Sequence, residues 1–219
     1  MRPEDMEIQE RIRAKAKDLY LRYGIRSITK DMIALQLGIS KKTIYHFFAD
    51  KHELVEAVTV DLLEHNTQIC EVDKARASDA IHQIFLAMEM AQEMFATMNP
   101  SLVFDLEKYH PSAYEKYVAF KNAYLYRIIK NNLEWGLAED LYRQDIDVEI
   151  ITRIRIETMM LPFSPVFSAS AKFKMSDVQD QLVEHFLFGI ASLKGYNLIL
   201  KYKEARNKKP STDASIKHT

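Results

Sequence analysis

Apolar residues recur every three to four positions along almost all of this 219-residue chain, which is the period of an amphipathic α-helix. The alternation of single apolar and polar residues that marks a strand is not evident. Only five glycines and six prolines interrupt the pattern. The sequence therefore predicts an all-α protein of about nine helices. Besides a short helix between Thr29 and Gly38, the helices are expected at 3–23, 41–48, 50–72, 78–98, 101–109, 112–135, 146–160 and 176–202.

Two short helices joined by a tight turn are expected between Ile28 and Leu54. Thr29 can cap the first helix, Gly38 suits the left-handed position at its end, and Ser40 can cap the second helix by accepting a backbone N–H bond. Further along, Asp50 and Glu53 form an acidic variant of the capping box. This arrangement is a helix-turn-helix followed by the start of a longer helix.

The second short helix separates apolar from donor side chains. Ile44, Phe47 and Phe48 recur at i, i+3 and i+4 and are expected to point inward. The residues left outside or beside that face are donors, as phosphates and guanine edges require. They are Lys41, Lys42, Thr43, Tyr45 and His46.

The order and spacing of residues over the first quarter of the chain resemble the TetR family of bacterial transcriptional regulators. The matching residues are Tyr23-Gly24, Thr29, Ile33-Ala34, Gly38-Ile39-Ser40, Tyr45-His46-Phe47-Phe48 and Lys51. The resemblance implies an N-terminal three-helix DNA-binding domain and a larger helical domain for ligand binding and dimerisation. We expect boundaries of 1–50 for the first domain and 51–203 for the second, with a disordered tail at 204–219.

The resemblance also implies contacts to double-stranded operator DNA. We expect Thr43, Tyr45 and Lys51 to anchor phosphates, while Lys41 and Lys42 face base edges. The expected DNA-binding set is Thr29, Lys30, Ser40, Lys41, Lys42, Thr43, Tyr45, His46 and Lys51. One position departs from the family, because Phe47 stands where Tyr or His is common, so the phosphate contact usual there is not carried over.

Charge is distributed unevenly although the formal net charge is only −1. Residues 11–51 contain ten Lys and Arg against three Asp and Glu, whereas the rest of the chain is acidic on balance. A basic end on an acidic body is expected when only that end docks on a polyanion.

Family members typically enclose a small-molecule pocket in the larger domain. The stretch 78–135 contains many flexible or aromatic side chains, which suit an adaptable pocket but also describe an ordinary core. We expect an apolar or aromatic effector, since no glycine-rich phosphate loop is visible. The candidate lining residues are Phe85, Met88, Phe95, Phe104, Tyr109, Tyr117, Phe120 and Tyr124.

A homodimer is expected because one helix-turn-helix contacts only half of a palindromic site. Helices at 146–160 and 176–202 carry apolar stripes, and Gly189, Ser192 and Gly195 are small enough for another helix to approach. The candidate interface residues are Ile154, Leu182, Phe186, Gly189 and Leu193. The alternative is that these stripes pack only within one subunit.

The sequence offers no pattern for catalysis or for a metal. One cysteine, Cys70, excludes an internal disulfide, and it is expected to be a small buried side chain, with a redox-sensing thiol as the alternative. No His-Glu-x-x-His motif, paired-Cys spacing or Gly-x-Ser-x-Gly elbow occurs. We expect no enzyme activity, no cofactor and no metal site. The charged N-terminus lacks the apolar core of a signal peptide and no apolar run is long enough to span a membrane, so a cytoplasmic protein is expected.

Three functions are compared. The first is a repressor released from a palindromic operator by a small molecule, with helix 50–72 as the mechanical link. The second is a regulator with the same DNA-binding fold that responds to a protein partner, for which the loop 161–175 is available, or stays constitutively bound. The third is an all-helical enzyme or carrier, which the missing catalytic constellation disfavours. Neither the operator, the effector nor the sign of regulation follows from the sequence.

Overall fold

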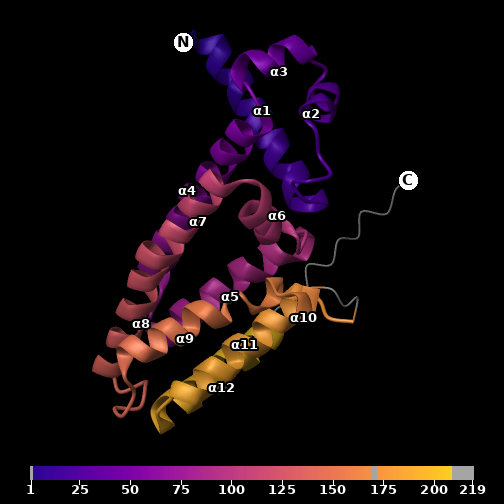
Figure 1. Ribbon diagram of the computed structural model, residues 1–219. Helices are drawn as coiled ribbons and strands as arrows, with labels where there is room; N and C mark the ends of the chain where they lie inside the picture. Colours follow the sequence, from indigo (N-terminus) through magenta and orange to yellow (C-terminus); the bar gives the residue numbers. More distant parts are fainter. Residues whose placement is uncertain (1, 169–171, 209–219) are drawn as a thin grey trace.

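The computed structural model describes residues 2–168 and 172–208, and the described residues are almost entirely helical (Figure 1). Their only strand-like feature is an isolated bridge between Tyr142 and Ala191. The elements in chain order are α1 Pro3–Tyr23, α2 Lys30–Leu37, α3 Lys41–Phe47, α4 Lys51–Arg76, α5 Ala80–Thr97, α6 Leu102–Tyr109, α7 Pro111–Phe120, the π-turn η1 Lys121–Leu125, α8 Tyr126–Ala138, α9 Val148–Thr158, the 3-10 turn η2 Leu161–Phe163, α10 Pro165–Ser168, α11 Met175–Ile190 and α12 Leu193–Lys208.

Helices α1 to α3 form a small head at one end of the molecule (Figure 1). One isoleucine from each helix is fully buried in a common core: Ile12 of α1, Ile33 of α2 and Ile44 of α3. That core continues into α6 and α7, because Leu102 and Ala113 belong to the same cluster. The head is therefore packed on the body rather than tethered to it.

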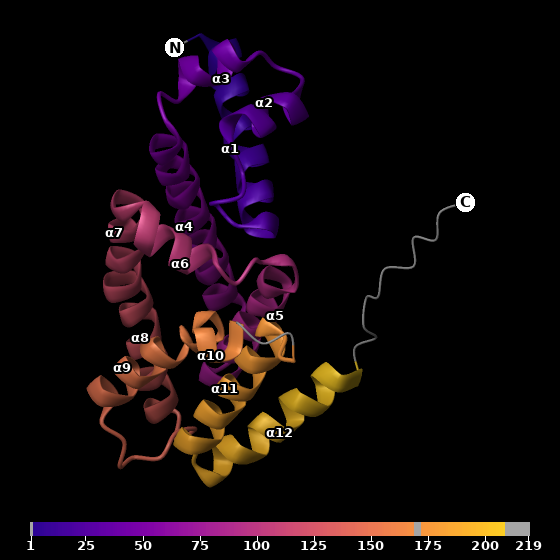
Figure 2. The ribbon, with the colours of Figure 1, turned by 45° about the vertical axis from the view of Figure 1, so that its right-hand side comes forward.

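Helix α4 runs from the head into the body alongside α7, as both views show (Figures 1 and 2). Asp50 accepts the Glu53 backbone N–H at 2.9 Å, and Glu53 accepts the Ala49 backbone N–H at 2.7 Å. These bonds confirm the expected capping box, which satisfies donors that a helix N-terminus leaves free. The start of α4 is thus fixed directly after the head.

The expected helix 112–135 is one continuous helical run, α7–η1–α8, with a π-turn in its middle. The expected end at 135 is too early, because α8 continues through Gly136 to Ala138. Gly136 serves packing instead: a Cβ there would lie 2.0 Å from the Tyr142 ring. The glycine lets the chain fold back closely on its own helix.

The expected single helix 176–202 is divided into α11 and α12 at Ala191-Ser192. The break has a tertiary cause. The returning segment after α8 supplies hydrogen bonds to the interrupted backbone, with Ser192 N donating to Leu141 O at 3.0 Å and Arg143 N donating to Ile190 O at 2.9 Å. Such bonds replace the helical ones that are lost.

Two further expectations changed near the C-terminus. The segment 161–175, expected to be a loop, contains η2 and α10 in its described part. The tail expected at 204–219 begins later, since α12 continues to Lys208, and its remainder, 209–219, lies outside the described residues.

Candidate functional site

The helix-turn-helix has the expected local geometry. Thr29 Oγ1 accepts the Met32 backbone N–H at 3.2 Å, and Ser40 Oγ accepts the Thr43 backbone N–H at 3.0 Å. Gly38 ends α2 in the left-handed region with φ at 67°. Each side chain satisfies a backbone donor that the helix start leaves free, so the turn and the beginning of α3 are held by short-range bonds.

Helix α3 presents polar side chains at the surface of the head. Lys41, Lys42, Tyr45 and His46 are exposed, and Thr43 is half-buried. Lys41 Nζ lies 2.5 Å from Asp31 Oδ2 of α2. An exposed ion pair of this kind contributes little and can be exchanged for a phosphate or base at small cost.

Lys30, expected to contact DNA, is instead buried inside the head. Its ammonium donates to Phe48 O at 3.0 Å and Ala49 O at 2.8 Å, and it lies 3.5 Å from the centre of the Tyr45 ring. Burial also lowers the Lys30 pKa. The expectation for Lys30 was wrong, because its charge is used to close the segment between α3 and α4.

Lys51, expected to anchor a phosphate, also has partners within the protein. Its ammonium donates to Ile25 O at 2.6 Å and lies 3.4 Å from Arg26 O, joining the start of α4 to the turn after α1. The side chain is half-buried, and burial lowers its pKa. The structure thus gives Lys51 a positioning role in place of the expected phosphate contact.

A buried imidazole lies near the start of α4, at the junction between head and body. His110, between α6 and α7, is 6% exposed, and its ring centre lies 4.7 Å from that of His52 on α4. Burial, followed by the neighbouring His52 and Lys51, lowers the His110 pKa to about 4. Nearby, Asp105 accepts the Arg26 backbone N–H at 3.1 Å. The contact between head and body therefore includes two buried polar side chains, Asp105 and His110.

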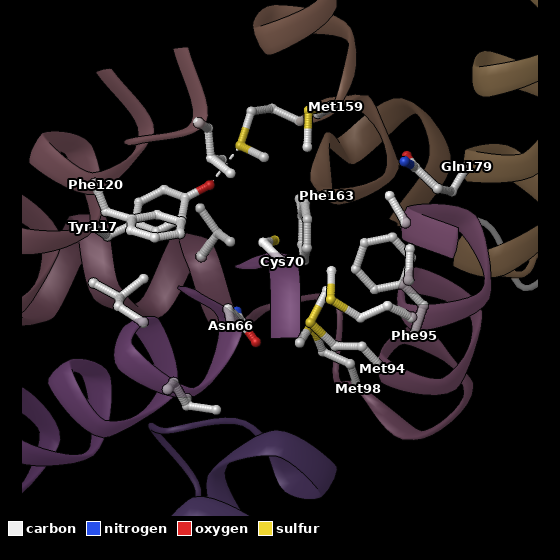
Figure 3. Close-up of a pocket in the computed structure, with 18 of the residues that line it drawn as sticks. Asn66, Cys70, Met94, Phe95, Met98, Tyr117, Phe120, Met159, Phe163 and Gln179 are labelled. Carbon is white, nitrogen blue, oxygen red and sulfur yellow. Dashed lines mark hydrogen bonds between the residues drawn. The ribbon is translucent and has the colours of Figure 1, made fainter. Parts of the chain in front are cut away.

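A cavity of about 270 Å³ lies in the body where α4, α5, the α7–α8 run, α9 and α11 meet. Its lining is mostly apolar and rich in methionine: Met94 and Met98 stand on one side with Phe95, opposite Tyr117 and Phe120 (Figure 3). The methionines of the lining are Met88, Met90, Met94, Met98, Met159 and Met160. Such flexible side chains suit an adaptable apolar site.

Half of the expected lining residues reach this cavity, namely Met88, Phe95, Tyr117 and Phe120. The Tyr117 hydroxyl donates to Met160 Sδ, a weak acceptor, at 2.6 Å. The π-turn begins directly after Phe120, and Leu125 at its end also lines the cavity.

The other four expected lining residues lie elsewhere, so those assignments were wrong. Phe85 packs in the core against the Tyr202 ring, and Phe104 is 53% exposed. Tyr109 lies under the Arg26 guanidinium, near the head. Tyr124 donates its hydroxyl to Thr67 O and Glu71 on the flank of α4. The number of aromatic residues in a helix does not indicate which face of that helix lines the cavity.

Several polar lining residues were missed by sequence reasoning. Asn66 and Cys70 face the cavity from α4, one turn apart (Figure 3). Cys70 is half-buried as a small side chain, and burial raises its pKa to about 11, which keeps the thiol protonated. Arg155 and Gln179 also line the cavity and are buried. No sequence signal separates a buried arginine from an exposed one on an amphipathic helix.

The expected dimer residues divide into two groups. Ile154, Gly189 and Leu193 are exposed, and Leu182 is half-buried. Phe186 instead lines the cavity, so its assignment to a subunit interface was wrong. Gly195 packs within its own chain, because a Cβ there would lie 2.0 Å from Leu141 O. The exposed apolar side chains of α9 and α12 are Ile150, Ile154, Leu193, Tyr196 and Leu200.

Two kinds of site are absent from the part of the chain that the structure describes. No three His, Cys, Asp or Glu side chains there are arranged to hold a metal ion. None of the described helices combines the length and the apolar character needed to cross a membrane.

Comparison with known proteins connects this geometry to a family. Residues 12–58 match the family model described as bacterial regulatory proteins, tetR family. The chain is 24% identical over 197 residues to an uncharacterised HTH-type transcriptional regulator, YvaF, of Bacillus subtilis (strain 168), which covers 84% of this chain and 96% of that protein.

Solved structures share the whole fold. A TetR-family regulator from Agrobacterium tumefaciens matches with a TM-score of 0.72 at 18% identity, covering 86% of this chain and 100% of that one. The regulator FadR from Bacillus subtilis, in complex with stearoyl-CoA, matches with a TM-score of 0.65 at 17% identity, covering 83% and 98%. A regulator from Saccharomonospora viridis in complex with choline matches with a TM-score of 0.69 at 16% identity, covering 85% and 99%. The helix-turn-helix head matches the TetR family, and the whole chain has the fold of TetR-family transcriptional regulators.

Proposed function

We propose that this regulator binds a palindromic operator as a homodimer, represses transcription there, and is released when a small molecule occupies the cavity. The observation that carries the proposal is the position of α4. Its N-terminus is tied to the head through Lys51 and Ile25, and its residues from Val55 to Asp73 line the cavity along one face. A ligand therefore contacts the element that positions the head.

The head itself also borders the cavity. Tyr20 of α1 and Ile25, which follows α1, are both lining residues. Because packed cores hold discrete arrangements, a ligand that spreads the wall between α4 and α5 favours a tilt of α4. In a dimer, that tilt changes the distance between the two α3 helices, which must be about 34–36 Å to enter successive major grooves.

Related proteins support a small-molecule effector. FadR of Bacillus subtilis was solved with stearoyl-CoA and the Saccharomonospora viridis protein with choline, so this fold accommodates ligands of different size and charge. For this chain the cavity of about 270 Å³ lies near the lower end of small-molecule pockets, roughly 300 Å³. We propose an effector much smaller than an acyl-CoA, with a mainly apolar body.

The operator is tested by selecting sequences from a random DNA pool with the full-length protein. We expect an inverted repeat whose half-sites are about one helical turn apart, because a two-fold dimer reads the same bases twice. Selection of sites with no two-fold symmetry would contradict the proposal that the protein binds DNA as a two-fold dimer.

Release is tested by fluorescence anisotropy on the selected operator. A compound that calorimetry places in the cavity should weaken operator binding, and the operator should weaken binding of that compound by the same factor. The coupling requires a preference for the released form, since equal affinity for both forms shifts nothing. If a ligand bound in the cavity leaves operator affinity unchanged, release by an effector is contradicted, while the proposal of DNA binding stands.

A further inference from the structure

A buried arginine lines the cavity without an acidic partner. Arg155 of α9 is only 8% exposed, and its Nη1 has no hydrogen-bond partner among the described residues. No ion pair is formed by its guanidinium in the part of the chain that is described, and its Cζ lies 5.3 Å from the centre of the Phe186 ring. A buried charge without a counter-charge is strongly unfavourable.

Acidic side chains near the cavity are already engaged. Asp73, which lines it, lies 3.4 Å from Arg76. Asp180 of α11 lies 3.1 Å from Arg206 and accepts a bond from Gln92 at 2.7 Å. These pairs leave the charge of Arg155 uncompensated. Its place in the last turn of α9 is favourable for a cation but does not satisfy Nη1.

A second unsatisfied group accompanies the arginine. Gln179 of α11 is 5% exposed, and its Oε1 has no hydrogen-bond partner among the described residues. Val183 and Phe186, the latter beside Arg155, follow on the same face of α11 and also line the cavity. Figure 3 shows the Gln179 amide pointing toward the cavity centre. Two buried polar side chains thus line a space whose walls are mainly methionine, phenylalanine and aliphatic side chains, with Asn66 and Cys70 also facing it from α4.

We propose that Arg155 is the anchor for the carboxylate of a small amphipathic acid, with Gln179 contributing a further polar contact and the apolar lining enclosing the hydrophobic body. This inference rests on the proposed function and specifies the chemical class of the effector. A planar guanidinium matches a carboxylate with two parallel hydrogen bonds. One guanidinium balances one negative charge, which favours a monoanion over a dianionic phosphate.

The same geometry predicts which molecules are rejected. A neutral molecule of the same shape leaves Arg155 without a counter-charge, and a cation adds a second positive charge to a poorly solvated site. The apolar wall, in turn, disfavours acids without a hydrophobic body. Selectivity should therefore follow the charge of the head group when the tail is held constant.

The test uses the full-length protein and probes that share a tail. Calorimetry compares decanoate, decanol and decyltrimethylammonium, and separately 2-naphthoate and 2-naphthol. For at least one pair, we expect the acid to bind at least tenfold more tightly than its alcohol, and we expect the cation to bind most weakly. In Arg155→Met, the preference for the acid should disappear, while binding of the alcohol should stay equal or improve.

Two controls separate this role from a merely structural one. Arg153→Met removes an exposed arginine of the same helix, paired with Glu149, and should keep the preference for the acid. Arg155→Lys retains the positive charge and should keep part of the preference for the acid. Thermal unfolding should find ligand-free Arg155→Met at least as stable as the parent protein, because an unpaired buried charge has been removed.

The outcomes are decisive and separable from the proposed function. If neither acid is preferred over its alcohol, or if the preference survives in Arg155→Met, the carboxylate anchor is refuted. If the preference is lost in Arg155→Met but a bound acid leaves operator affinity unchanged, the anchor stands and the effector mechanism fails.

Discussion

Lysines 42 and 51 have the same charge and lie nine positions apart, yet the structure gives them different roles. Lys42 is exposed on α3, whereas Lys51 is half-buried and donates to backbone carbonyls between α1 and α2. The difference arises from burial, because a carbonyl-bound ammonium cannot replace a counterion on DNA without losing those bonds. The two side chains can be separated experimentally.

We expect Lys51→Met to lower the free energy of unfolding by roughly 1–2 kcal/mol through the lost hydrogen bonds, with the salt dependence of DNA binding unchanged. Lys42→Met should leave stability nearly unchanged but weaken the selected operator by roughly 1–3 kcal/mol. Urea unfolding and anisotropy titrations over a range of salt concentrations measure both quantities. A salt slope reduced by about one in Lys51→Met would restore Lys51 as a phosphate contact.

His110 makes stability depend on pH. Burial lowers its pKa from 6.5 to about 4, so between these values the unfolded chain takes up a proton that the native protein excludes. Stability is therefore complete above pH 6.5 and falls as the pH drops toward 4. Asp105 and Asp50 oppose this shift only in part.

We expect His110→Asn, which has no titrating ring, to lose less stability than the parent protein between pH 7 and pH 4.5, by roughly 1–3 kcal/mol. Urea unfolding at both pH values measures the difference. The exposed His65 of α4 provides a matched control, His65→Asn, which should follow the parent protein. Equal acid sensitivity of His110→Asn and the parent protein would show that His110 is accessible to protons.

At the scale of elements, close packing decides where helices end. Gly136 continues α8 rather than ending it, because its missing side chain admits the Tyr142 ring. That ring is buried, and its hydroxyl donates to Asn132 Oδ1 at 2.9 Å. Asn132 in turn donates to Ala80 O at 2.8 Å, which connects α8 to α5.

Gly136→Ala should therefore destabilise the protein by roughly 1–3 kcal/mol, because a methyl group overlaps the ring in a packed core. Gly189→Ala is the matched control, since nothing lies within 4 Å of a Cβ at that position of α11, and alanine favours a helix. Thermal unfolding of both variants gives the comparison. A neutral effect of Gly136→Ala would mean that the Tyr142 ring moves freely.

For the whole molecule, the exposed apolar face of α12 supports the proposed dimer. Leu193, Tyr196 and Leu200 lie three to four residues apart and are 79%, 46% and 44% exposed. Large apolar side chains gathered on one helix face mark an interaction surface. Phe186 faces the cavity, so a substitution there does not test the interface.

We expect Leu193→Glu to shift the protein toward monomers at micromolar concentration, because a carboxylate would be buried in the interface without a partner. Light scattering after gel filtration measures the mass, and operator affinity should fall in parallel. Leu35→Glu alters an equally exposed apolar residue in the head and should remain dimeric. A dimer that survives in Leu193→Glu would place the interface elsewhere.

The sequence by itself determined the features that depend on neighbours a few residues apart. The capping side chains of Thr29, Ser40 and Asp50 each accept the backbone N–H of the residue three positions later in the chain. The turn after α2 depends on the left-handed conformation of a single residue, Gly38. These interactions need no distant contact, so the helix-turn-helix and the fold class could be read from the pattern. Half of the cavity-lining candidates were found because the right stretch of chain was identified.

Only the tertiary structure decided which polar side chains are buried and what they face. Lys30 donates to carbonyls eighteen and nineteen positions away, and the buried Arg155 lies beside Phe186 of α11. The break before α12 likewise depends on hydrogen bonds to a segment about fifty positions earlier. A lysine or arginine on a helix has the same local pattern whether exposed or enclosed, because its environment is set by which distant elements pack against it.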